Sequence, residues 1–73
     1  MIVGGCDVGS TTGKSVILDE SGILGQSIIP STTSPEKTAR AAMDAALKIA
    51  GLASAEELAY VVGTGYGRMK VPF

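Results

Sequence analysis

The chain has 73 residues, of which 45% are hydrophobic and 18% charged, and its formal net charge is −1. This composition excludes a disordered chain, and the scattered Lys and Arg residues form no basic cluster for nucleic acid. No apolar run is long enough to span a membrane. The N-terminus also lacks the features of a secretion signal, so we expect a cytoplasmic protein.

The small size limits how the chain can be stabilised. A domain this short buries only about 60% of the surface that its unfolded chain exposes. The single cysteine cannot form an internal disulfide, and the chain has no histidine for a Cys/His metal site. We therefore expect part of a larger protein, or a chain that covers its apolar surface by forming a homodimer or larger oligomer.

Three short strands are predicted in the first half of the chain. Residues 1–8 are small or apolar without alternation, which is typical of a central strand buried on both faces. Residues 14–19 and 23–29 follow as a second and a third strand, separated by a tight turn at 20–22. Short connections between successive strands favour an antiparallel meander.

A helix and a fourth strand are predicted next. Ser34 is a suitable N-cap, Pro35 suits the first helical position and Gly51 is a typical helix stop. Between them one helical face is apolar: Ala39, Ala42, Met43, Ala46, Leu47 and Ala50. Residues 54–57 have capping-box spacing, and 58–62 form a fourth strand. A right-handed helical crossover would make that strand parallel to an earlier one.

The sequence DVGSTTGK at residues 7–14 is a candidate phosphate-binding hairpin. Gly9 and Gly13 allow close approach of the backbone to an anion and the unusual dihedral angles of a tight turn. Hydroxyl groups and the Lys14 charge suit phosphate oxygens. The Asp7 carboxylate would repel phosphate unless a hydrated Mg²⁺ lies between them. The pattern therefore indicates a Mg-nucleotide site.

The residues of this hairpin allow two other interpretations. The sequence ends like a P-loop, but the first glycine of that motif should stand at Val8, and strand rather than helix follows. The P-loop is therefore rejected. An ordinary hairpin turn remains open, because Gly, Ser and Thr are common in turns. Asp7 and Lys14 on either side favour the phosphate site.

The hairpin resembles the first phosphate loop of the actin, sugar-kinase and heat-shock-chaperone superfamily of ATPases. That resemblance implies an α/β fold with a ribonuclease H-like core, of which residues 1–73 would be an N-terminal part of one lobe. It also implies that Asp7 is the catalytic and metal-side residue, orienting Mg²⁺ through water. The implied phosphate contacts are Gly9, Ser10, Thr11, Thr12 and Lys14.

A second glycine-rich motif, GTGYGR, occupies residues 63–68. It is not the dinucleotide fingerprint, because the last glycine comes one position early. It can be read as a flexible exit from the fourth strand. Ligands of open α/β sheets gather outside the carboxyl ends of strands, so the loop could also lie beside the Asp7 hairpin. Gly65 and Arg68 are then candidate nucleotide-binding residues.

Together the two motifs resemble the BadF/BadG/BcrA/BcrD ATPase family, which includes activators of 2-hydroxyacyl-CoA dehydratases and ATP-binding subunits of benzoyl-CoA reductase. The resemblance implies ATP and Mg²⁺ as cofactors and a reductase or dehydratase component as partner. It also implies ATP-driven, low-potential electron transfer from a [4Fe–4S] cluster held between two subunits of the full-length protein. The cluster cysteines of the family lie downstream of this sequence, and Cys6 is read as a small buried hydrophobe.

We therefore expect the ATP-binding part of such an ATPase, inactive as an isolated piece because the second phosphate loop and second lobe are absent. A piece of a sugar or acetate kinase is an alternative that shares the first loop but does not explain TGYGR. A small interaction module without catalysis, whose glycine loops are only turns, is the alternative from another class.

Overall fold

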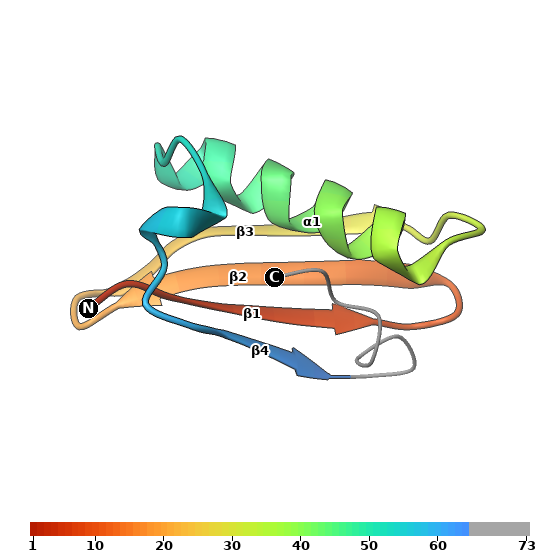
Figure 1. Ribbon diagram of the computed structural model, residues 1–73, viewed down its shortest axis with the longest axis horizontal. Helices are drawn as coiled ribbons and strands as arrows, with labels where there is room; N and C mark the ends of the chain where they lie inside the picture. Colours follow the sequence, from red (N-terminus) through yellow and green to blue (C-terminus); the bar gives the residue numbers. More distant parts are fainter. Residues whose placement is uncertain (65–73) are drawn as a thin grey trace.

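The computed structural model describes residues 1–64, which form one four-stranded sheet with a single long helix across one face (Figure 1). The sheet order is β3-β2-β1-β4, in which β4 is parallel to β1 and the other pairs are antiparallel. This confirms the predicted meander, helix and parallel fourth strand. In chain order the elements are β1 (Val3–Val8), β2 (Thr12–Asp19), β3 (Gly22–Pro30), α1 (Pro35–Ala50), the 3-10 turn η1 (Ala55–Glu57) and β4 (Val61–Thr64).

The fourth strand begins three residues later than predicted. Leu58, which the sequence placed in the strand, is 9% exposed and packs into the core beside η1. Its backbone N–H donates to the Ala55 carbonyl, so the chain is still turning at this point. Pairing with β1 begins at Val61, opposite Gly4, and continues to Thr64. The first two residues of the GTGYGR motif therefore belong to the strand rather than to a loop.

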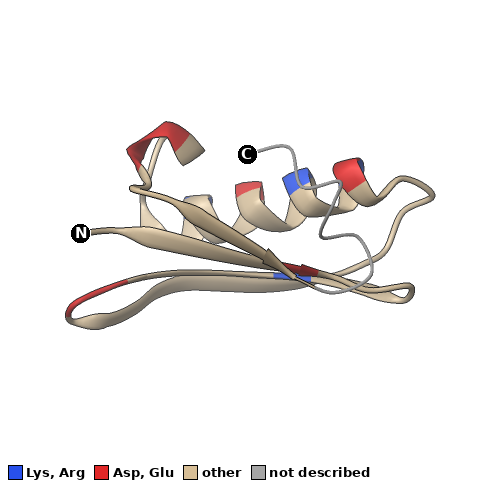
Figure 2. Cartoon of the chain, turned by 60° about the horizontal axis from the view of Figure 1, so that its bottom comes forward, with Lys and Arg blue, Asp and Glu red and all other residues tan. Residues whose placement is uncertain are grey.

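Helix α1 has the predicted ends. The Ser34 side chain accepts a hydrogen bond from the Lys37 N–H, and Pro35 occupies the first turn. At the other end Gly51 is left-handed, with φ of 79°, and its N–H donates to the Leu47 and Lys48 carbonyls. The predicted apolar face lies on the sheet, while the charged residues of α1 lie on its outer side (Figure 2). Thr38, which the apolar pattern did not include, is also fully buried.

Glycines let the helix lie close to the sheet. A Cβ added at Gly25 would stand 2.5 Å from the Ala46 carbonyl oxygen, which is backbone and cannot rotate away. A Cβ at Gly13 would stand 2.4 Å from the Thr38 Cγ2 methyl. The core consists of two clusters between α1 and the sheet, formed by Ile17, Met43, Ala46, Leu47 and Leu58 and by Cys6, Val8 and Ala39.

The other face of the sheet is open over the described residues. The prediction that the first strand is buried on both faces is wrong here, because its burial alternates strictly and α1 covers one face alone. Ile28 and Val62 lie on the open face and are 70% and 57% exposed. Within residues 1–64, apolar side chains on this face are therefore exposed.

Candidate functional site

The predicted phosphate hairpin is the turn between β1 and β2. It is closed by a hydrogen bond of 2.9 Å from the Gly9 N–H to the Thr12 carbonyl, and its tip residues Ser10 and Thr11 are exposed. Among residues 1–64, neither the Ser10 nor the Thr11 backbone N–H has a hydrogen-bond partner. Two free N–H groups at an exposed turn are the donors that an oxyanion requires. The hairpin therefore has backbone donors suited to an anion.

The two glycines of the hairpin act differently from the sequence-based expectation. Positive φ angles occur among the described residues only at Gly22 and Gly51, so neither Gly9 nor Gly13 needs glycine for its dihedral angles. Gly13 is required for space, since Thr38 of α1 lies directly over it. Gly9 is less constrained, because a Cβ there would meet only the Thr12 carbonyl oxygen, at 3.4 Å. The need for glycine at residue 13 therefore comes from its packing against α1, which the local sequence does not show.

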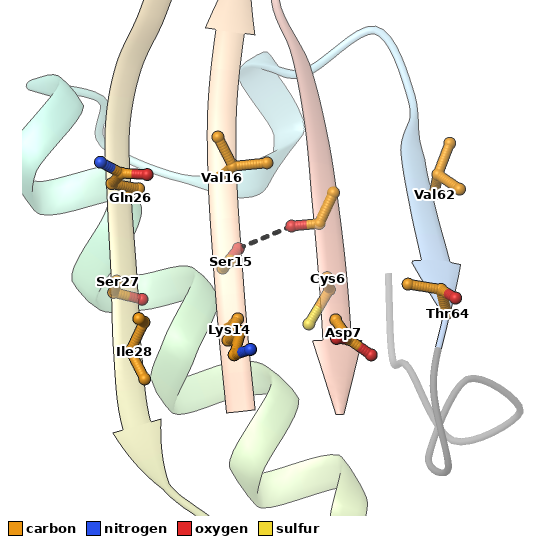
Figure 3. Close-up of a pocket in the computed structure, with 11 residues that line it drawn as sticks. Cys6, Asp7, Lys14, Ser15, Val16, Gln26, Ser27, Ile28, Val62 and Thr64 are labelled. Carbon is orange, nitrogen blue, oxygen red and sulfur yellow. Dashed lines mark hydrogen bonds between the residues drawn. The ribbon is translucent and has the colours of Figure 1, made fainter. Parts of the chain in front are cut away.

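Three polar side chains form a row across neighbouring strands beside the hairpin. Asp7 is paired in register with Lys14 of β2 on one side and with Thr64 of β4 on the other. Neighbouring strands are about 4.8 Å apart, so paired residues have adjacent side chains on the same face. Figure 3 shows this row on the open face, with Asp7 between the other two. Asp7 is half-buried, while Lys14 and Thr64 are exposed.

The row borders a shallow pocket of about 310 Å³ on the open face. Its polar end is formed by Asp7, Lys14 and Thr64, and its remaining floor includes Val16 and Val62 (Figure 3). An ammonium group and a carboxylate side by side next to free N–H groups can hold an anion and a cation together. The site thus combines the charges that a phosphate and its metal ion need.

The second predicted motif is placed only in part. Its Thr64 is the last described residue of β4, and Gly65 and Arg68 lie outside the described residues. Thr64 itself was not among the predicted site residues. Sequence reasoning gave the parallel pairing of the fourth strand, but the residue opposite Asp7 depends on a register that no local pattern specifies.

The donor set suits Mg²⁺ but not an iron–sulfur cluster. Asp7 is the one carboxylate at the pocket, and no three acidic, His or Cys residues gather to form a metal site in residues 1–64. Mg²⁺ keeps several waters and is commonly held by one or two carboxylates together with substrate phosphates, so a single Asp fits it. A cluster requires several thiolates. The chain has one cysteine, and it faces the helix.

Cys6 lies under α1, where it is 2% exposed. Its thiol is directed at the Ala39 carbonyl oxygen, 4.0 Å away. Burial, together with the nearby Asp7 charge, raises the pKa of the Cys6 thiol above its usual range. A buried thiol with a raised pKa is chemically inert, so the reading of Cys6 as a small hydrophobe agrees with the packing.

Helices that could cross a bilayer are absent from residues 1–64, since α1 is both too short and too polar. No protein-family model and no curated protein matches the chain. Solved structures do match, over 94% of this chain and about a quarter of their own length.

The first of these structures is component A of the (R)-2-hydroxyglutaryl-CoA dehydratase of Acidaminococcus fermentans. It is 30% identical to this chain, with a TM-score of 0.83, and the match covers 26% of it. The second is the activator of the 2-hydroxyisocaproyl-CoA dehydratase of Clostridium difficile, with bound ADPNP. It is 37% identical, with a TM-score of 0.81, and 25% of it is covered. The chain has the fold of the actin-like ATPases, and over 94% of its length it is similar to the solved component A and activator proteins of 2-hydroxyacyl-CoA dehydratases.

Proposed function

We propose that the chain is the ATP-binding part of an ATPase that drives low-potential electron transfer to a 2-hydroxyacyl-CoA dehydratase or a benzoyl-CoA reductase. The observation that carries this proposal is a shared position. The turn with the free Ser10 and Thr11 N–H groups and the Lys14–Asp7–Thr64 row lie at the same end of the sheet. The adenine nucleotide analogue bound to the similar activator of Clostridium difficile supports it.

Each group of the site has a role in this proposal. The hairpin N–H groups and the hydroxyls of Ser10, Thr11 and Thr12 bind the β- and γ-phosphates, and Lys14 adds a positive charge. Asp7 would hold a Mg²⁺ ion through its waters, and the ion would neutralise part of the phosphate charge. Thr64 stands beside Asp7 in register, and its hydroxyl would be able to hydrogen-bond the same waters. Gly65 and Arg68 are proposed as further nucleotide contacts because they continue the same motif.

The test is the change of Asp7 to Asn in the complete protein that carries this segment. The amide keeps the shape of the side chain but loses the charge that orients the metal. We expect ATP turnover to fall by about 100-fold or more with the fold retained. Asp44→Asn is the matched control, since it makes the same chemical change on the exposed outer side of α1. Unchanged turnover in Asp7→Asn would favour a non-catalytic interaction module.

The isolated chain should bind Mg-ATP weakly or not at all. The chain covers about a quarter of the similar structures, and a nucleotide enclosed between two lobes loses much of its contact surface when one lobe is missing. Calorimetric titration of residues 1–73 with Mg-ATP measures this directly. Micromolar affinity would show that the hairpin and its row suffice, and would contradict the proposal of an inactive piece.

The partners follow from the same proposal. The uncovered apolar face, with Ile28 and Val62 exposed, supports contact with further protein, which we propose to be a second subunit or the rest of the lobe. The dehydratase or reductase component is the electron acceptor, and the protein is cytoplasmic. A [4Fe–4S] cluster is proposed only for the full-length protein, and none of its ligands is assigned to this chain.

A further inference from the structure

The segment that joins β3 to α1 touches the phosphate hairpin, although it lies well outside the DVGSTTGK motif. Ser31 directly follows Pro30, the last residue of β3. Its backbone N–H donates to the Thr11 carbonyl at 2.9 Å, and its hydroxyl donates to the Gly9 carbonyl at 2.8 Å. One residue therefore holds two of the carbonyl groups of the hairpin tip.

These two bonds fix the orientation of the hairpin peptides. A trans peptide is planar, and its C=O and N–H groups point in opposite directions. When Ser31 holds the Gly9 carbonyl, the N–H of Ser10 in the same peptide plane must point away from Ser31. That N–H has no partner among residues 1–64, so the contact determines where a free donor is directed. Without the hydroxyl, the peptide between Gly9 and Ser10 loses this restraint.

Ser31 is itself held in place by the helix. The N–H of the next residue, Thr32, donates to the Thr38 hydroxyl at 2.8 Å. The hydroxyl oxygens of Thr32 and Thr38 are 3.0 Å apart. Thr38 is fully buried, its hydroxyl also donates to the Ser34 carbonyl, and its methyl lies over Gly13. The hairpin is thus tied to the first turn of α1 both through Ser31 and Thr32 and through Gly13.

We infer that Ser31 is a positioning residue for nucleotide binding, which directs the Ser10 N–H toward the phosphates by holding the Gly9 carbonyl. This inference rests on the proposed function of the hairpin. Ser31 does not itself touch the nucleotide in this scheme. Its hydroxyl is directed at a carbonyl, so it acts through the backbone alone.

The test compares Ser31→Ala with two other variants of the complete protein. Ser31→Thr keeps the hydroxyl and should restore the wild-type behaviour. Ser27→Ala is the matched control, because Ser27 lies on β3, just before Ser31, and its hydroxyl also donates to a backbone carbonyl, that of Ala42. It removes a bond of the same kind without touching the hairpin.

Loss of one such hydrogen bond corresponds to a roughly three- to tenfold effect. We expect Ser31→Ala to raise the KM for ATP by that factor, with kcat little changed. Amide exchange at Gly9 should become faster by a similar factor, because the Gly9 N–H closes the turn by donating to the Thr12 carbonyl. Ser27→Ala should lower the unfolding midpoint without either change. Equal KM values in Ser31→Ala and Ser27→Ala, or failure of Ser31→Thr to restore KM, would overturn the inference.

Amide exchange also separates this inference from the proposed function. If the complete wild-type protein does not bind Mg-ATP, the proposed function is wrong and with it the nucleotide role of Ser31. If the wild type binds Mg-ATP while Gly9 exchange is the same in Ser31→Ala and wild type, only the inference about Ser31 is wrong.

Discussion

The sheet has two hairpin turns at opposite ends of β2, and they are completed in different ways. The β2–β3 turn is closed by its own residues, since the Asp19 carboxylate accepts from both the N–H of Ser21, at 2.8 Å, and its hydroxyl, at 2.6 Å. The β1–β2 turn leaves the Ser10 and Thr11 N–H groups free within residues 1–64 and is held from outside by Ser31. One turn pairs donors with its own carboxylate, whereas the other leaves two N–H donors without a partner in residues 1–64.

This difference shows how a turn with unpaired N–H groups can be held by contacts from outside it. A turn that pairs its own N–H groups needs only local residues, and a side chain such as Asp is well suited to that purpose. A turn that must present N–H groups to an anion cannot use them for its own stability. Its carbonyl groups are then the available attachment points, and the β3–α1 connection uses two of them.

The largest effect on stability is expected from Gly13→Ala in the binding turn. The new Cβ would stand 2.4 Å from the Thr38 methyl, so the helix or the strand has to move. We expect a loss of about 3 kcal/mol in the free energy of unfolding, the upper end for overpacking. Urea denaturation measures it. Thr38→Ser removes the methyl and keeps the hydroxyl, so the double variant should recover most of the loss; additive losses would contradict the packing explanation.

A smaller effect is expected from Gly22→Ala in the self-closed turn. Gly22 has a φ of 128°, which side chains other than glycine rarely adopt, and its added Cβ would meet no atom within 4 Å. The cost is therefore backbone strain alone, about 1 kcal/mol, because an exposed turn can relax. The same denaturation experiment applies. Since Thr38 is not involved, Thr38→Ser should leave this loss unchanged, in contrast to the Gly13 pair.

The smallest effect is a pH dependence at the same turn. The hydrogen bond from the Ser21 side chain, followed by that from its backbone, lowers the pKa of the Asp19 carboxyl. A lowered pKa in the folded state stabilises the protein above the unfolded pKa, and this stability is lost as the pH falls below about 4. Asp19→Ala should therefore be less stable than wild type at pH 7, and the difference should shrink in acid.

Ser21→Ala sharpens the pH experiment, because it removes the hydroxyl donor while keeping the backbone N–H donor. Its stability should depend on pH less steeply than that of the wild type between pH 7 and acid, as measured by thermal unfolding at each pH. A profile parallel to wild type would show that the hydroxyl does not lower the Asp19 pKa.

Much of the fold followed from local patterns. The ends of α1 were marked by Ser34, Pro35 and Gly51, whose roles depend only on the adjoining turns of the helix. The order of strands followed from their apolar composition and short connections. The start of β4 was misplaced because Leu58 is apolar in either setting, and only its packing against the core decides between strand and turn.

The candidate site was predictable to a similar extent. The candidate hairpin, with Asp7 and Lys14 on either side, could be identified from eight consecutive residues, because turn formers and charges at this spacing are typical of a phosphate site. The reason for Gly13 could not be identified, since the clash that excludes a side chain there comes from Thr38 on the helix.

The sequence by itself determined the types and order of the elements, the position of the candidate hairpin and the family resemblance, because each of these depends on short stretches of chain. Only the tertiary structure decided that Thr64 stands beside Asp7, that Thr38 covers Gly13 and that Ser31 holds the Gly9 carbonyl. These contacts join residues far apart in the chain, and they depend on strand register and on how closely α1 approaches the sheet, which no local pattern specifies.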